Sequence, residues 1–190
     1  MLRLSAIVRL LTLAALLLTL ASNISAQDKA TATFTGKVSA LSIPATEIGG
    51  EWTGPTGLVV DDLNDFSSHP AEVQAVAKSL KEQAPPGVNA FADFTYRKQG
   101  FPLQQVTLRM FVFDSAEKCS HWWQTKYQYE GWQKHYNPVA GDERALDSKE
   151  TPKRAVAFAN VWLTCGSLND PSAHMEILNQ YIKRIKSQIK

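Results

Sequence analysis

The chain has 190 residues, which is enough for one compact domain after a leader is removed but hardly for two. Its apolar share of 44% and charged share of 20% are those of an ordinary globular protein and exclude a disordered or membrane-embedded chain. The formal net charge is +2, and without Arg3 and Arg9 of the leader the 18 basic side chains equal the 18 acidic ones. A neutral chain gives no electrostatic reason to expect nucleic acid as a partner.

Residues 1–26 have the parts of a secretory signal peptide. Arg3 and Arg9 precede an apolar run from Leu10 to Ala21, and a small residue, Ala26, ends the polar segment that follows. The apolar run is shorter than the roughly 20 residues that span a bilayer. We expect cleavage after Ala26 and a secreted or periplasmic protein without stable membrane insertion. An uncleaved N-terminal anchor is the alternative.

Residues 27–46 are small and polar, and they are either a flexible lead-in or an edge strand. We expect the rest of the chain, 47–190, to form a single domain. Four glycines and a proline between Ile48 and Gly57 predict turns, because Gly reaches positive φ and Pro fixes φ. Leu58–Val60 is a short strand candidate.

Helical and strand periods alternate through the middle of the chain. The first helix is expected to begin at Pro70 and to end at the Ala84-Pro85 step. Two segments with apolar residues at every second position follow, at Ala90–Lys98 and at 106–113. A Gly-Phe-Pro turn joins them, so we expect a hairpin.

The second half of the chain predicts two more helices and two more strands. The second helix is expected from about Ser115 to Glu130, with Asp114 as its N-cap. A short strand at Arg144–Asp147 and a longer one at Ala155–Cys165 come next, and a helix from about Pro171 to Ile189 ends the chain. Together the elements predict an α+β fold: one domain with a largely antiparallel sheet of about four to five strands and helices packed on one face.

The two cysteines suggest a disulfide. Cys119 and Cys165 each lie close to the point where an apolar strand leads into an amphipathic helix. In an exported protein, two cysteines are most often bonded to each other. If the two strands run parallel, their ends share an edge of the sheet, and we expect a Cys119–Cys165 bond. Antiparallel strands would instead place Cys165 at the far end.

No catalytic or metal-binding motif stands out. Cys119 and His121 are two positions apart and point in different directions on a helix, so they do not form a thiol–imidazole pair. No serine lies in a Gly-x-Ser-x-Gly motif. The two cysteines, with His121 and His135, have the residue types of zinc ligands, but their spacings match no zinc pattern. We therefore expect no metal, no cofactor and no catalytic residue that a motif identifies.

The segment after His121 is rich in aromatic residues. Trp122 and Tyr129, seven positions apart, lie together on a flank of the second helix, and Trp132 and Tyr136 follow in the next loop. One interpretation is that the loop folds back as a lid and buries these rings in a second small core. The other is that the four rings form a ligand or partner-binding surface, since exposed Trp and Tyr residues hold apolar ligands and protein partners.

These observations favour an exported, non-catalytic domain that binds a protein partner or a small ligand in the cell envelope or outside the cell. The alternative is a secreted hydrolase whose acid–base residues are too scattered for a motif to show. A cleft with several titratable groups facing one another would favour the hydrolase. An aromatic-rimmed cleft without them would favour the binding domain.

Overall fold

A computed structural model gives the fold of most of the chain after residue 32. The predicted signal peptide, 1–26, lies outside the described residues, as do residues 27–32. The structure describes residues 33–65, 67, 69–100, 103–129, 132–134, 144–148, 151–169 and 172–190, and of residues 126–129, 132–134 and 144 it describes the backbone alone. Within these residues, no helix is both long enough and apolar enough to cross a membrane.

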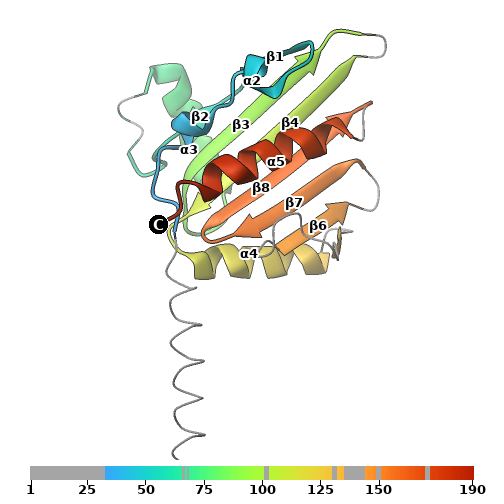
Figure 1. Ribbon diagram of the computed structural model, residues 1–190. Coiled ribbons are helices and arrows are strands. Elements are labelled where there is room, and N and C mark those ends of the chain that lie inside the picture. Colours follow the sequence, from blue (N-terminus) through green and yellow to red (C-terminus); the bar gives the residue numbers. More distant parts are fainter. Residues whose placement is uncertain are drawn as a thin grey trace, which may run out of the picture. The chain divides into compact units, whose positions relative to one another are not determined.

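The described strands form one antiparallel sheet in the order β1-β3-β4-β8-β7-β6-β5, and β2 follows β1 along the same edge of β3 (Figure 1). Their bounds are β1 (Trp52–Thr56), β2 (Val59–Val60), β3 (Val88–Lys98), β4 (Gln104–Phe113), β5 (Trp132–Lys134), β6 (Arg144–Ser148), β7 (Lys153–Phe158) and β8 (Val161–Leu168). The predicted α+β class and antiparallel sheet are confirmed. The predicted count of four to five strands is too low.

Helices cover both faces of the sheet, and the prediction that they pack on one face is wrong. α5 (Ala173–Lys186) lies across one face, together with η1 (Val38–Leu41) and α2 (Ala45–Ile48). We call this the α5 face. α3 (Ala71–Gln83) and α4 (Ala116–Tyr129) pack on the opposite side, the α4 face.

The strands carry apolar side chains on both faces of the sheet, and this explains why a second layer of helices is present. The predicted inward side chains of β4, at every second position from Val106 to Val112, are buried on the α5 face. Phe91, Phe113 and Trp162 occupy the intervening positions and are buried on the α4 face. Because each face exposes large apolar groups, each has to be covered from water.

The strand that we expected at Ala155–Cys165 is a hairpin made of β7 and β8. The chain turns at Ala159 and Asn160, and Ala159 has a positive φ of 48°. Phe158 pairs with Val161 across the turn, so odd-numbered residues face α4 before the turn and α5 after it. Both faces of β7 and β8 are apolar, so neither strand shows an alternation of apolar and polar residues. The hydrophobic pattern therefore does not reveal the turn between them.

The described part of the polar N-terminal stretch, residues 33–46, packs on the α5 face. Phe34 is 2% exposed and forms an isolated antiparallel bridge with Ile189. Val38 and Leu41 of η1 are fully buried in the same core cluster. These residues therefore supply core side chains to the domain.

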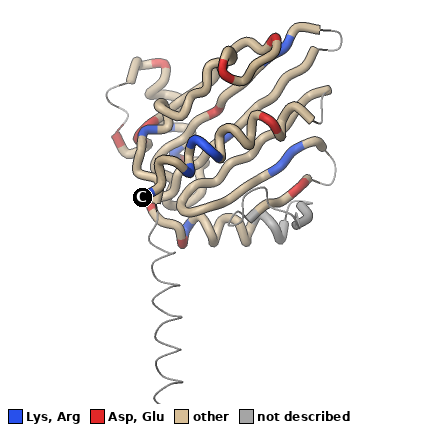
Figure 2. Tube along the Cα trace, in the orientation of Figure 1, with Lys and Arg blue, Asp and Glu red and all other residues tan. Residues whose placement is uncertain are grey.

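The basic second half of α5 faces the acidic N-terminal part of the domain (Figure 2). The Arg184 guanidinium donates to the backbone carbonyl of Ser42 at 2.8 Å and pairs with the Glu47 carboxylate at 2.6 Å. Lysine and arginine at a helix C-terminus also interact favourably with the helix dipole. Charge and capping thus join α5 to η1 and α2, the first helices that the structure describes.

The starts of the other two helices each differ by one residue from the prediction. Pro70, the predicted first helical residue of α3, is its N-cap and makes no side-chain capping hydrogen bond. At α4 the cap is Ser115 and not Asp114: the Ser115 Oγ accepts the backbone N–H of Lys118 at 3.2 Å. The Asp114 carboxylate pairs with the ammonium group of Lys118.

Candidate binding sites

The predicted aromatic flank of α4 borders a hollow of about 330 Å³, which we call the Trp122 hollow. Its lining is mostly apolar, and the residues that line it are Pro85, Pro86, Ser115, Glu117, Lys118, His121 and Trp122. Trp122 is half-buried, and it packs against the core of the α4 face as well as lining the hollow. The ring therefore has both a structural contact and a solvent-facing surface.

The structure does not test the other three predicted site residues. The side chains of Tyr129 and Trp132 lie outside the described residues, as does all of Tyr136. The backbone places Tyr129 at the last position of α4 and Trp132 at the first position of β5, where it pairs with Ser148 of β6. Their membership of a surface with Trp122 stays a prediction.

The predicted disulfide is not formed. Neither Cys119 nor Cys165 is in a disulfide, and both side chains are fully buried. Cys119 belongs to the core of the α4 face and Cys165 to the core of the α5 face, so the sheet separates them. The prediction assumed parallel strands, but β4 and β8 are antiparallel, with Cys165 opposite Leu108 in the middle of β4.

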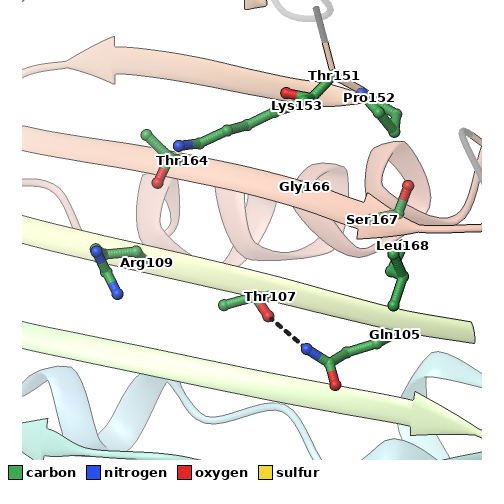
Figure 3. Close-up of a pocket in the computed structure, with 10 residues that line it drawn as sticks. All are labelled: Gln105, Thr107, Arg109, Thr151, Pro152, Lys153, Thr164, Gly166, Ser167 and Leu168. Atoms are coloured by element: carbon green, nitrogen blue, oxygen red, sulfur yellow. Dashed lines mark hydrogen bonds between the residues drawn. The ribbon is translucent and has the colours of Figure 1, made fainter.

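A second hollow, also of about 330 Å³, lies on the part of the α4 face that the described helices leave exposed (Figure 3). We call this region the open sheet face. The strand register arranges its side chains in three rows across the sheet: Asp93, Arg109 and Thr164; Thr95, Thr107, Gly166 and Lys153; Arg97, Gln105 and Leu168. Phe91, Phe111 and Trp162 lie on the same face, one row beyond the first of these rows, and begin the part that the helices cover.

Arg109 lies in the first row between Asp93 and Thr164, and contacts with its neighbours hold its side chain in place. Its Nε and Nη2 donate to the Asp93 Oδ2 at 3.2 and 2.8 Å. Its guanidinium carbon also lies 5.9 Å from the centre of the Phe91 ring, and that ring packs against Phe111 at 5.5 Å between centroids. The guanidinium orientation is therefore fixed by the protein itself.

Gly166 forms the floor of the second hollow between Thr107 and Lys153. Figure 3 shows the Lys153 side chain stretched along the face with its ammonium group beside Thr164, and Arg109 on the next strand. A Cβ at Gly166 would lie 3.3 Å from the Lys153 Cγ. The absence of a side chain at Gly166 therefore makes room for the Lys153 side chain, which lies against β8 at this point. Thr107 accepts a hydrogen bond from the Gln105 amide at 3.4 Å at the other side of the hollow.

Displaced pKa values occur away from both hollows. Burial raises the pKa of Cys165, Tyr96 and Tyr181, all in the core of the α5 face. Hydrogen bonds from Ser67 lower the pKa of the exposed Asp65 carboxyl. Within the described ranges, no three His, Cys, Asp or Glu residues are close enough to hold a metal ion.

The sequence contained a weak signal for the open sheet face. Asp93, Thr95 and Arg97 alternate with the apolar residues of β3, which predicts a polar side for that strand. Thr107 and Arg109 repeat the pattern in β4, and the register brings the two polar sides together. Only the antiparallel pairing with β8 adds Thr164 and Gly166 from a distant part of the chain.

No protein-family model and no curated protein matches the chain. Among solved structures, the extracellular domain of PknH from Mycobacterium tuberculosis is similar, with 12% sequence identity and a TM-score of 0.45 over 78% of this chain and 94% of that chain. A likeness this distant assigns no function, ligand or partner to the protein.

Proposed function

We propose that the protein is an exported, non-catalytic binding domain and that the flank of α4 around Trp122 contacts its partner or ligand. Export rests on the signal-peptide pattern of residues 1–26. The observation that carries the binding proposal is the hollow in which Trp122 lies with Pro85 and Pro86. A large ring beside two prolines offers apolar surface that loses little conformational entropy when a ligand covers it.

The size of the hollow limits what enters it. Small-molecule sites usually measure about 300–1,000 Å³. At about 330 Å³, the Trp122 hollow accepts one large apolar side chain of a partner or one small ring compound. Tyr129, Trp132 and Tyr136 follow Trp122 closely along the chain, and we propose that they extend the contact surface beyond the hollow.

The polar residues around the hollow favour binding over hydrolysis. Ser115 accepts the backbone N–H of Lys118, so its hydroxyl caps a helix and has no general base as a hydrogen-bond partner among the described residues. Lys118 in turn is paired with Asp114. The groups whose pKa is displaced, such as Tyr181, lie elsewhere. Glu117 and His121 also line the hollow, but among the described residues no hydrogen bond joins either of them to Ser115. The described lining therefore has an apolar wall without a nucleophile–base pair.

The test is an NMR titration that follows the indole N–H signals of the purified protein. Indole and a short proline-containing peptide serve as probes. We expect the Trp122 signal to shift and the signal of Trp162, which is 3% exposed, to stay in place. Trp122→Leu keeps an apolar group against the core, and we expect it to abolish the shifts of neighbouring amides.

The matched control is Val76→Ser, which removes an exposed apolar side chain from α3 outside the hollow. We expect this variant to bind both probes as the unmodified protein does. Saturating probe that leaves the Trp122 signal unchanged would contradict the proposal. So would a Trp122→Leu variant that binds normally but melts at a much lower temperature, because Trp122 would then be a core residue alone.

A further inference from the structure

We propose that the open sheet face binds a small hydroxylated anion, a sugar acid or a sugar phosphate, whose charged group lies over Thr164 between Lys153 and Arg109. This site is separate from the Trp122 hollow and shares no lining residue with it. The two candidate ligands have the same chemistry, an oxyanion carried on a body with several hydroxyl groups.

The charges of the open sheet face favour an anion. Across β3, β4, β7 and β8 its described side chains include three cations, Arg97, Arg109 and Lys153, and one carboxylate, Asp93. Asp93 lies on β3, on the far side of Arg109 from Thr164. Over the whole chain after the leader, acidic and basic side chains are equal in number, so this positive excess is local. A local excess of one sign attracts and orients a ligand of the other.

The Arg109 side chain is already oriented for anion binding by its contacts within the protein. The Asp93 carboxylate accepts hydrogen bonds from the Nε and Nη2 of Arg109, and the guanidinium group makes a cation–π contact with the Phe91 ring. Nη1 makes no hydrogen bond to the residues that the structure describes, so a donor remains for a ligand. Since the side chain is already oriented, little further conformational entropy is lost on binding. Planar guanidinium groups suit carboxylate and phosphate oxygens in particular.

Lys153 lies on the opposite side of the hollow. It is two strands and one row from Arg109, about 12 Å between Cα atoms for regular sheet spacing. Figure 3 shows its side chain reaching back along the face towards Thr164, which lies between the two cations. An oxyanion above Thr164 is therefore within reach of an ammonium group, a guanidinium group and a hydroxyl donor.

Gly166 and the polar side chains around it account for the hydroxylated part of the ligand. β8 keeps a regular register at Gly166, without a bulge, and the residue has no positive φ, so the backbone does not require glycine there. The glycine leaves room for the Lys153 side chain, since a Cβ there would lie 3.3 Å from the Lys153 Cγ, and it also lets a ligand approach the backbone of β8. Thr107 and Gln105 border this space, and their hydroxyl and amide groups can donate to and accept from sugar hydroxyls.

The test measures binding of glucuronate, glucose 6-phosphate, glucose and inorganic phosphate to the purified protein by calorimetry and amide chemical shifts. We expect one or both sugar anions to bind with shifts at Thr107, Thr164 and Gly166. We expect glucose and inorganic phosphate each to bind at least about tenfold more weakly, because each lacks half of the recognised chemistry. The sugar anion that binds more tightly identifies carboxylate or phosphate as the charged group.

Three variants test the placement of the ligand. Arg109→Gln and Lys153→Gln each remove one charge-assisted contact, and we expect each to raise Kd about tenfold or more. Gly166→Val fills the floor of the hollow without changing charge, and we expect it to abolish binding. Lys78→Gln on α3 is the matched control, because it removes an exposed lysine from outside the open sheet face.

Equal affinity for glucose and its anions would overturn the proposal, since charge would then play no part. Equal affinity for inorganic phosphate and glucose 6-phosphate would also overturn it, because a bare anion would then suffice. Absence of binding by both sugar anions at about 10 mM, a concentration far above ordinary ligand dissociation constants, would overturn it as well. Lys153→Gln decides the matter if Gly166→Val fails to fold: an unchanged Kd in this surface variant would refute the site.

Discussion

The side-chain amide of Asn160 hydrogen-bonds both backbone groups of Phe34. Its Oδ1 accepts the Phe34 N–H at 2.7 Å, and its Nδ2 donates to the Phe34 carbonyl at 3.1 Å. The same Nδ2 donates to the carbonyl of Phe113, the last residue of β4, at 2.8 Å. One turn residue thus joins the first described segment of the chain to the centre of the sheet, 126 positions away in sequence.

Asn160→Ala is expected to destabilise the protein by about 3 kcal/mol, because it removes three buried hydrogen bonds and leaves backbone groups without partners. Urea unfolding followed by far-UV circular dichroism measures the change. Asn64→Ala, at an exposed asparagine, is the control and should stay within about 0.5 kcal/mol of the unmodified protein. Equal losses in the two variants would show that the amide of Asn160 has no special role.

A chain that begins at Gln27 is expected to be as stable as one that also carries residues 1–26. A chain that begins at Lys37 should be less stable by about 3–5 kcal/mol, because it lacks Phe34, which is 2% exposed in the core. Denaturant unfolding of the two truncated proteins tests this. If both unfold at the same denaturant concentration, the segment around Phe34 contributes nothing to the fold.

Both thiols are expected to be reduced and protected from reagents in the native protein. Cys119 and Cys165 are fully buried on opposite faces, and burial raises the pKa of the Cys165 thiol, which lowers its thiolate fraction. Alkylation at about pH 8 without reductant should therefore label neither cysteine before unfolding and both after it. Mass spectrometry counts the labels. Unfolded, unreduced protein that accepts no label would demonstrate a disulfide.

The hydroxyl groups of Tyr96 and Tyr181 lie 2.7 Å apart in the core, and Tyr96 also donates to the carbonyl of Ile43 at 2.7 Å. Burial raises the pKa of both tyrosines above the ordinary value. Above about pH 10 the unfolded chain loses these protons while the folded protein keeps them. The folded state then binds more protons, so its stability falls as the pH rises.

Tyr181→Phe is expected to cost about 2 kcal/mol near pH 7, because it removes two buried hydrogen bonds, one with the Tyr96 hydroxyl and one accepted from the Ile43 N–H at 3.4 Å. Between about pH 10 and pH 11 its stability should fall less steeply than that of the unmodified protein, by up to about 1.4 kcal/mol per pH unit for the lost tyrosine. Denaturant unfolding across this pH range provides both curves. Parallel curves would mean that Tyr181 does not contribute to the alkaline loss.

The sequence by itself determined the α+β class, helix α3, the β3–β4 hairpin and the last helix. Each has a local cause: period-two alternation in β3 and β4, Pro70 before α3, and the apolar stripe of α5. Local patterns also predicted the polar side of β3 at Asp93 and Arg97. They placed Trp122 on a flank of the second helix, where the structure shows a hollow.

Only the tertiary structure decided how these elements share the sheet. The hydrophobic pattern does not reveal the turn at Asn160, because the strands on both sides of it are apolar on both faces. The one expected strand is therefore two strands, and odd-numbered residues face α4 in β7 but α5 in β8. The antiparallel pairing of β4 and β8 then placed Cys165 on the opposite face from Cys119. The same pairing set Thr164 beside Arg109. Strand register is a long-range property that hydrophobic alternation leaves undetermined when both faces of a sheet are buried.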